Sequence, residues 1–197
     1  TLVTLEDLFW RRGITPQAGK IYYSAKNTGV DRCERALWFD ESKLSTHWAA
    51  ASIDYVRQKG LMHNNPYGEF TPNFPLTRGM FVTCLGRLAG VEGDAASTGY
   101  RDLSAGHYAA PYAAWAKEAD IMRGLPDGRF TPDAPITRQE LATALARYAA
   151  LCGAERGDTS APVYHDQAAI ADWAKDGVAL CGQLGLLVGA NGTFSPT

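Results

Sequence analysis

The sequence predicts an all-α fold made of three helical repeats, preceded by a short N-terminal segment to which no structure is assigned. Two observations support this prediction. A set of motifs recurs at a step of about 60 residues, and apolar side chains within each repeat follow the three- and four-residue spacing of a helix face. Equal units that each expose an apolar stripe can bury it only against one another. We therefore expect a pseudo-threefold arrangement of the repeats.

The repeat is clearest in a glycine turn. Residues 65–72 read Asn-Pro-Tyr-Gly-Glu-Phe-Thr-Pro, residues 125–132 read Leu-Pro-Asp-Gly-Arg-Phe-Thr-Pro, and residues 190–196 read Ala-Asn-Gly-Thr-Phe-Ser-Pro. A Pro-Leu-Thr-Arg element at 75–78 recurs as Pro-Ile-Thr-Arg at 135–138. These motifs divide the chain into an unassigned segment and three units, the third of which we expect to be truncated: 1–38, unit one (39–92), unit two (93–153) and unit three (154–197).

Each unit is expected to open with an aromatic-x-Asp-like approach followed by a first helix, which begins near Trp48, Tyr108 or Trp173. The second helix begins at the Thr-Arg element. Residues spaced four and three apart share one helix face. They predict the buried stripes of the first helix in unit two and of the second helices in units one and two: Tyr108, Tyr112, Trp115 and Ala119; Phe81, Leu85 and Leu88; Leu141, Leu145 and Tyr148.

The second helices differ in their capping residues. Thr137 is followed three residues later by Glu140, which predicts a capping box in which the hydroxyl and the carboxylate each bond a free backbone N–H of the first turn. Thr77 is followed by Met80, which cannot return such a bond. The start of the helix in unit one should therefore be weaker by about 0.5 kcal/mol.

The glycine turn and the cysteines do not indicate a metal site. Gly128 supplies a left-handed residue and Asp127 tolerates the corner before it, whereas a calcium loop would need several more carboxylates at alternate positions. The cysteine spacing matches no zinc or redox motif, and we expect small buried thiols, with one disulfide still open for an extracellular protein. The four cysteines are Cys33, Cys84, Cys152 and Cys181.

Composition excludes several classes of function. The formal net charge is -2 and the pI is about 6.1, and no basic run indicates nucleic acid or a membrane surface as a partner. Every apolar stretch ends well short of a membrane span, so no membrane insertion is expected. No nucleophile or dinucleotide motif occurs, and neither catalytic residues nor a cofactor are expected. The chain begins at Thr1 without a signal-peptide pattern and reads as a processed or trimmed piece of a longer protein.

The order and spacing of these motifs resemble the S-layer homology repeat of bacterial surface proteins. The resemblance covers residues 39–197 and is closest at residues 124–130 and 134–140. Unit one departs from the pattern, because Gly79-Met80 replaces a small residue and Glu, and because Asn64 stands where unit two has Gly124. Proteins of this family usually carry three repeats, which implies a helical pseudo-threefold spindle.

The resemblance implies non-covalent anchoring of a secreted protein to the cell wall, without enzymatic activity. Grooves between repeats would bind a pyruvylated secondary cell-wall polysaccharide, with Arg78 and Arg138 as the central contacts and Asp127 and Gly128 on the adjoining turn. Other surface-layer proteins are further candidate partners, and the expected location is the cell surface. The alternative is a protein-interaction module that uses the repeats as a scaffold and binds no glycan.

Helix chemistry points to the same arginines without the family. A cation at a helix N-terminus is unfavourable by about 0.3–1 kcal/mol, yet Arg78 and Arg138 both stand there. The position becomes favourable when an anion binds, because the guanidinium and the free N–H groups then converge on one carboxylate. The alternative is that each arginine forms a salt bridge to an acid in the next repeat.

One aromatic side chain per unit stands at a matching position, at Trp48, Tyr108 and Trp173. These rings could stack on a sugar, or they could be part of the core or of a groove wall, which is the interpretation we favour. His47 and His107 precede two of them and are interpreted as helix-start residues rather than metal ligands.

Overall fold

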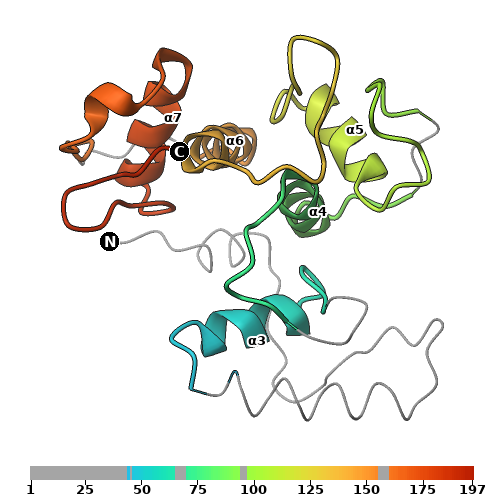
Figure 1. Ribbon diagram of the computed structural model, residues 1–197, viewed down its shortest axis with the longest axis horizontal. Coiled ribbons are helices and arrows are strands. Elements are labelled where there is room, and N and C mark those ends of the chain that lie inside the picture. Colours follow the sequence, from blue (N-terminus) through green and yellow to red (C-terminus); the bar gives the residue numbers. More distant parts are fainter. Residues whose placement is uncertain (1–43, 45, 65–69, 94–96, 155–159) are drawn as a thin grey trace.

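The described part of the chain is helical and has no strand. The computed structural model describes residues 44, 46–64, 70–93, 97–154 and 160–197. Figure 1 shows the helices in chain order: α3 (Ala50–Gln58), α4 (Arg78–Leu88), α5 (Ala110–Glu118), α6 (Arg138–Leu151), the 3-10 helix η1 (Gln167–Ala169) and α7 (Asp172–Gln183). The all-α prediction is confirmed. The unassigned segment 1–38, Cys33 and the glycine turn of unit one up to residue 69 lie outside the described residues.

Packing follows the repeat but crosses its boundaries. Among the described helices, α4 packs against α5 and α6 packs against α7, so the second helix of one unit meets the first helix of the next. Figure 1 shows the two pairs, with α3 lying apart from both. The helices α5 and α7 therefore occupy equivalent positions. Among the described helices, none packs against α3 in the way that α4 packs against α5.

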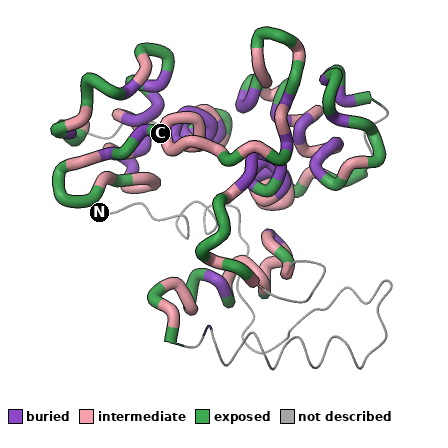
Figure 2. Tube along the Cα trace, in the orientation of Figure 1, coloured by how far each residue is buried: buried purple, intermediate pink, exposed green. Residues whose placement is uncertain are grey.

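Two hydrophobic cores hold the units together, and α6 contributes side chains to both of them. The first core joins Phe81, Val82 and Leu85 of α4 to unit two, and the second joins Ala142 and Ala146 of α6 to unit three. Purple segments in Figure 2 mark these buried stretches along the facing sides of each pair. Because both cores are shared between neighbouring units, each unit depends on the next for burial of its apolar surface.

The expected stripe of α5 is only partly correct. Its buried face is a row of alanines, Ala110, Ala113 and Ala116, whereas Tyr108 precedes the helix and is 50% exposed. Tyr112, Trp115 and Ala119 pack at the border of the core. Small residues occupy the centre of the interface between α4 and α5 because they let the two helix backbones approach closely.

Glycines make room for this approach on opposite partners in the two pairs. A Cβ on Gly86 of α4 would lie 2.4 Å from the ring of Tyr112, and a Cβ on Gly177 of α7 would lie 2.8 Å from the Cα of Thr143 in α6. Periodicity finds apolar residues, but it does not find which of them meets a glycine across the interface.

The predicted second helices and their caps are confirmed. Of their predicted stripes, Phe81, Leu85 and Tyr148 are buried, whereas Leu88, Leu141 and Leu145 are half-buried and pack against the first core. Thr137 and Glu140 form the capping box at the start of α6, and Thr77 accepts from the N–H of Met80 at 3.2 Å with no return bond.

The described cysteines are free thiols. Cys84 and Cys152 are half-buried and Cys181 is buried. The Sγ of Cys181 donates to the carbonyl of Ala142 at 3.1 Å. Desolvation raises the pKa of Cys181 to about 12 and that of Cys84 to about 11, so neither is a ready nucleophile at neutral pH.

Candidate functional site

The two Thr-Arg elements lie close to each other although they are 60 positions apart in the sequence. Thr77 forms an antiparallel bridge with Pro135. On either side of it, the N–H of Arg78 donates to the carbonyl of Ala134 and the N–H of Ile136 donates to the carbonyl of Leu76, both at 2.9 Å. The extended backbone before α4 therefore runs along the backbone before α6, and this contact brings the two helix starts together.

Each arginine of a Thr-Arg element binds the glycine turn of the following unit. The Nε of Arg78 donates to the carbonyl of Phe130 at 2.8 Å, and the Nε of Arg138 donates to the carbonyl of Phe194 at 2.8 Å. Each guanidinium group also lies over the ring of the phenylalanine that it bonds, Arg78 at 5.3 Å from the centroid of Phe130 and Arg138 at 5.2 Å from that of Phe194. We call these contacts the first junction (Arg78 with unit two) and the second junction (Arg138 with unit three).

An aspartate fixes the turn at each junction. Asp102 accepts from the N–H groups of Phe130 and Thr131, both at 2.8 Å. Asp166 accepts from Phe194 at 2.8 Å and Ser195 at 2.7 Å. At each junction the arginine thus binds the phenylalanine carbonyl of the turn, and the aspartate binds two backbone N–H groups of the same turn.

These backbone bonds shift the titration of both aspartates. For Asp102, desolvation opposes ionisation, but the N–H groups of Phe130 and Thr131 outweigh it and hold the pKa below its ordinary value. For Asp166, the N–H of Phe194 is the main cause of a lowered pKa. Both aspartates end the aromatic-x-Asp-like approach of their unit, and this recurrence was the signal in the sequence that could have indicated their role.

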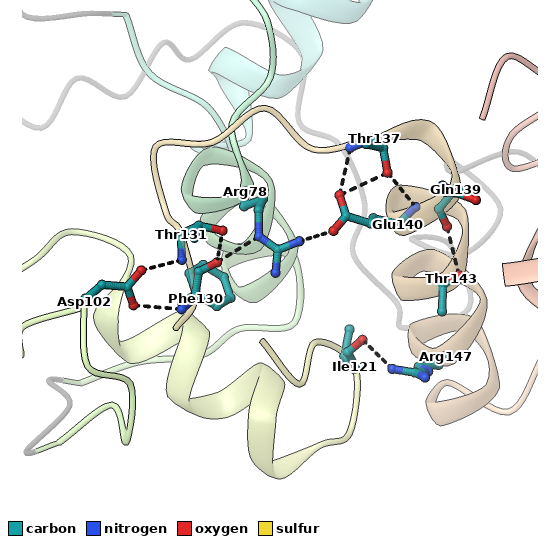
Figure 3. Close-up of polar contacts among 10 residues, drawn as sticks. All are labelled: Arg78, Asp102, Ile121, Phe130, Thr131, Thr137, Gln139, Glu140, Thr143 and Arg147. Atoms are coloured by element: carbon teal, nitrogen blue, oxygen red, sulfur yellow. Dashed lines mark hydrogen bonds and ion pairs between the residues drawn. The ribbon is translucent and has the colours of Figure 1, made fainter. Parts of the chain in front are cut away.

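The first junction is closed by an ion pair. Arg78 is 5% exposed, and its Nη1 lies 2.5 Å from Oε1 of Glu140, an acid of the next unit (Figure 3). Its backbone N–H is also bonded, to Ala134. The geometry here is that of the salt-bridge alternative considered for the arginines.

The second junction is more open. Arg138 is half-buried, and its Nη2 donates to the carbonyl of Val188 at 3.0 Å in an exposed contact. Within the described ranges, no acid forms an ion pair with Arg138, and its backbone N–H makes no hydrogen bond. Arg138 therefore keeps hydrogen-bonding capacity that Arg78 has already used.

The three matching aromatic residues are exposed. Trp48, Tyr108 and Trp173 have exposed fractions of 91%, 50% and 57%, so they are not core residues, and their assignment to a groove wall stays a prediction. They lie outside the core because the helices bury alanine, valine and cysteine at the adjoining positions instead.

Tyr108 adjoins the start of α4, and the backbone just before Trp173 adjoins the start of α6. A Cβ on Gly79 would lie 2.8 Å from the hydroxyl of Tyr108, which places this tyrosine beside the start of α4. Trp173 stands two residues after Ala171, whose N–H donates to the side-chain Oε1 of Gln139 at 3.0 Å. Trp173 thus follows a backbone segment that is tied to the start of α6.

The histidines and the turn residues have local roles. The Nδ1 atoms of His47 and His107 accept from the N–H groups of Ala49 and Ala109 at 3.1 Å and 3.2 Å, which confirms them as helix-start residues. Asp127 binds the side chain of Arg129 at 2.7 Å. Gly128 has a φ of +83°, and its carbonyl accepts from the N–H of Arg101 at 3.0 Å.

No group of three or more His, Cys, Asp or Glu side chains in the described ranges could hold a metal ion. None of the helices found there has the length and the apolar character needed to cross a bilayer.

One family model and several curated proteins match segments of this chain. The sequence model of the S-layer homology domain matches residues 43–79 and 99–142. The chain is 34% identical over 110 residues to the cellulosome-anchoring protein of Acetivibrio thermocellus, covering 53% of the chain and 24% of that protein. It is 28% identical over 151 residues to the S-layer protein sap of Bacillus anthracis, covering 76% and 18%.

A further relative is the amylopullulanase of Thermoanaerobacterium thermosulfurigenes, 28% identical over 156 residues, which cover 78% of the chain and 8% of the enzyme. The chain spans less than a quarter of the length of each of these three relatives. This chain therefore matches only a segment of each relative, and the three relatives have different names.

Proposed function

Because the sequence model of the S-layer homology domain matches residues 43–79 and 99–142, we propose that the chain is a non-enzymatic module that anchors a secreted or surface protein to the bacterial cell wall. Relatives named as an S-layer protein and as a cellulosome-anchoring protein support a location at the cell surface. The amylopullulanase matches over only 8% of its length, which fits an appended module better than a catalytic domain.

The proposed ligand is a pyruvylated secondary cell-wall polysaccharide, bound at the second junction. The observation that supports this most is the unused hydrogen-bonding capacity of Arg138. Its guanidinium and its backbone N–H stand at the N-terminus of α6, where the helix dipole favours a carboxylate. The N–H groups of Gln139 and Glu140 are bonded to Pro196 and Thr137, so the backbone donor that a ligand could use in this turn is that of Arg138. A ketal pyruvate supplies such a carboxylate on a sugar ring.

The exposed aromatic residues suit a sugar ligand. Trp173, which follows the segment tied to the start of α6, presents a large exposed apolar side chain, as Tyr108 and Trp48 do in the other units. A sugar ring stacked on one of these faces would remove exposed apolar surface from water. In this proposal Asp127 and Gly128 contribute through the shape of the turn, because both already have bonding partners within unit two.

The first junction is a weaker candidate for the same ligand. A carboxylate could bind Arg78 only by displacing Glu140 from an ion pair in which the arginine side chain is 7% exposed. We therefore assign binding to the second junction and a structural role to the first.

Isothermal titration with purified polymer tests the proposal. We expect the chain to bind pyruvylated polymer and to lose binding when the ketal is removed. Arg138→Ala should weaken binding roughly tenfold to a hundredfold, because it removes a charge-assisted contact of about 1.5–3 kcal/mol. Binding that ignores the ketal would favour the alternative function, a protein-interaction scaffold that makes no glycan contact.

The structure changes one expectation for this variant. Relief of the helix dipole alone would leave Arg138→Ala as stable as the parent, but Arg138 donates to Phe194 and Val188. Thermal melts should therefore show a modest loss of stability, and titration has to be carried out below the melting temperature of the variant. Arg147→Ala is the matched control: it removes an α6 arginine that donates to Ile121, away from the helix start.

A further inference from the structure

The contacts of Glu140 connect the two junctions. Its Oε2 accepts from the backbone N–H of Thr137 at 2.9 Å and from the Thr137 hydroxyl at 3.0 Å. Its Oε1 lies 2.5 Å from Nη1 of Arg78. Figure 3 shows this carboxylate between Arg78 on one side and Thr137 on the other. One side chain therefore completes the cap of α6 and the ion pair of the first junction.

Arg78 is itself held on several sides. Its Nε bonds the carbonyl of Phe130, whose N–H is bonded by Asp102. Its side chain is 7% exposed, against 26% for Glu140. A buried, multiply bonded guanidinium is a fixed point, and the more exposed carboxylate takes its orientation from it.

Arg138 directly follows the capped residue. Thr137 has extended backbone angles, and α6 begins at the next residue. The direction of the Arg138 side chain and of its backbone N–H therefore depends on how firmly the cap at Thr137 is held. A cap bonded by a carboxylate that is anchored at its other oxygen frays less than a cap bonded by a free one.

We infer that Arg78 is a positioning residue for the second junction: through Glu140 it fixes the start of α6 and thereby the orientation of Arg138. The inference rests on the proposed function, since it assigns ligand binding to Arg138. It differs from a direct role of Arg78 in binding, because Arg78 acts here only through the acid of the next repeat. Unit one has Met80 at the position of Glu140, so this link runs from unit one to unit two and has no counterpart at α4.

A double-mutant cycle tests the link. Arg78→Met and Glu140→Gln should each weaken binding of the pyruvylated polymer by roughly fivefold to tenfold, and the double variant should be no weaker than either single one. Losses that multiply in the double variant would show that Arg78 contacts the polymer independently and would overturn the inference. Unchanged binding in both folded single variants would overturn it as well.

Arg87→Met provides a matched control on the same helix. Arg87 donates to the carbonyl of Leu61 at 3.2 Å and has no contact with Glu140. Its loss removes an equal charge and a comparable bond, so binding should stay at the parent value. A loss equal to that of Arg78→Met would mean that any damage to α4 weakens binding, which contradicts a specific link.

A second readout separates this inference from the proposed function. The backbone N–H signals of Thr137 and Arg138 in nuclear magnetic resonance spectra should shift in Arg78→Met and stay in place in Arg87→Met. This holds without any polymer. If the parent fails to bind polymer but the signals shift, the proposed ligand is wrong and the link stands. If the parent binds and the signals stay in place, the link is wrong.

Arg78→Lys keeps the cycle informative if Arg78→Met does not fold. A lysine keeps the positive charge beside Glu140 but lacks the planar fork that bonds Phe130 and Glu140 together. Its binding loss should be smaller than tenfold and should vanish in the Glu140→Gln background. A loss that persists there would overturn the inference.

Discussion

The two junctions are built from the same parts and differ in how completely these parts are used. Both have an arginine at a helix start, a phenylalanine carbonyl that accepts from its Nε, and an aspartate that binds the turn. At the first junction the arginine is also paired with Glu140. At the second junction, within the described residues, no acid takes that place. The difference teaches that the same motif can hold two units together at one junction, while at the other junction its arginine keeps hydrogen-bonding capacity for a ligand.

Removing the two arginines should have the most unequal effect on stability. Arg78→Met leaves Glu140 without its cation and the carbonyl of Phe130 without its donor in a buried setting, at a cost of about 2–4 kcal/mol in the free energy of unfolding. Arg138→Met removes two bonds to partly exposed carbonyls, at a cost of about 1 kcal/mol. Urea titration of both variants measures the difference. Equal losses would mean that the ion pair adds nothing to the first junction.

Acid should affect the two junctions alike, because Asp102 and Asp166 have the same kind of partner. Their pKa values are lowered in the folded chain, so both aspartates stabilise the fold above their unfolded pKa near 4. That stability is lost as the pH falls through the lower, folded pKa. Asp102→Asn and Asp166→Asn should each flatten the fall in melting temperature between about pH 5 and pH 2. A fall as steep in both variants as in the parent would show that other carboxylates control acid unfolding.

The sequence predicts the local features of this molecule better than the contacts between its units. The capping box of Thr137 and Glu140, the one-sided cap of Thr77 and the roles of His47 and His107 follow from chemistry within four residues, and all are confirmed. The contact of Arg78 with Glu140 spans 62 positions. The sequence alone did not decide between this ion pair and a bound ligand, because the same arginine position suits either an acid of the next unit or an anionic ligand.

The sequence also did not predict which residues are buried at the start of a helix. Tyr108 and Ala109 are neighbours in a mixed apolar run, yet the tyrosine is 50% exposed and the alanine is fully buried. The larger apolar area of the tyrosine ring would favour burying it rather than the alanine. The close approach of α4 and α5 reverses this order, and it depends on glycines such as Gly86 that lie on the partner helix.

The smallest expected effect concerns the helix start that lacks an acid. Met80 is 39% exposed, so Met80→Glu places a carboxylate at the surface, where it can accept from the N–H of Thr77 and complete a capping box. An acid in the first turn also suits the helix dipole. We expect the free energy of unfolding to rise by about 0.5 kcal/mol in urea titration.

The reciprocal change shows whether the acid does more at α6 than at α4. Glu140→Met removes the same return bond but also leaves the buried guanidinium of Arg78 unpaired, so it should cost several times what Met80→Glu gains. If the two changes are equal and opposite, Glu140 is only a cap, and the ion pair with Arg78 contributes no stability. A loss at α6 that clearly exceeds the gain at α4 would show that the acid of unit two also holds unit one.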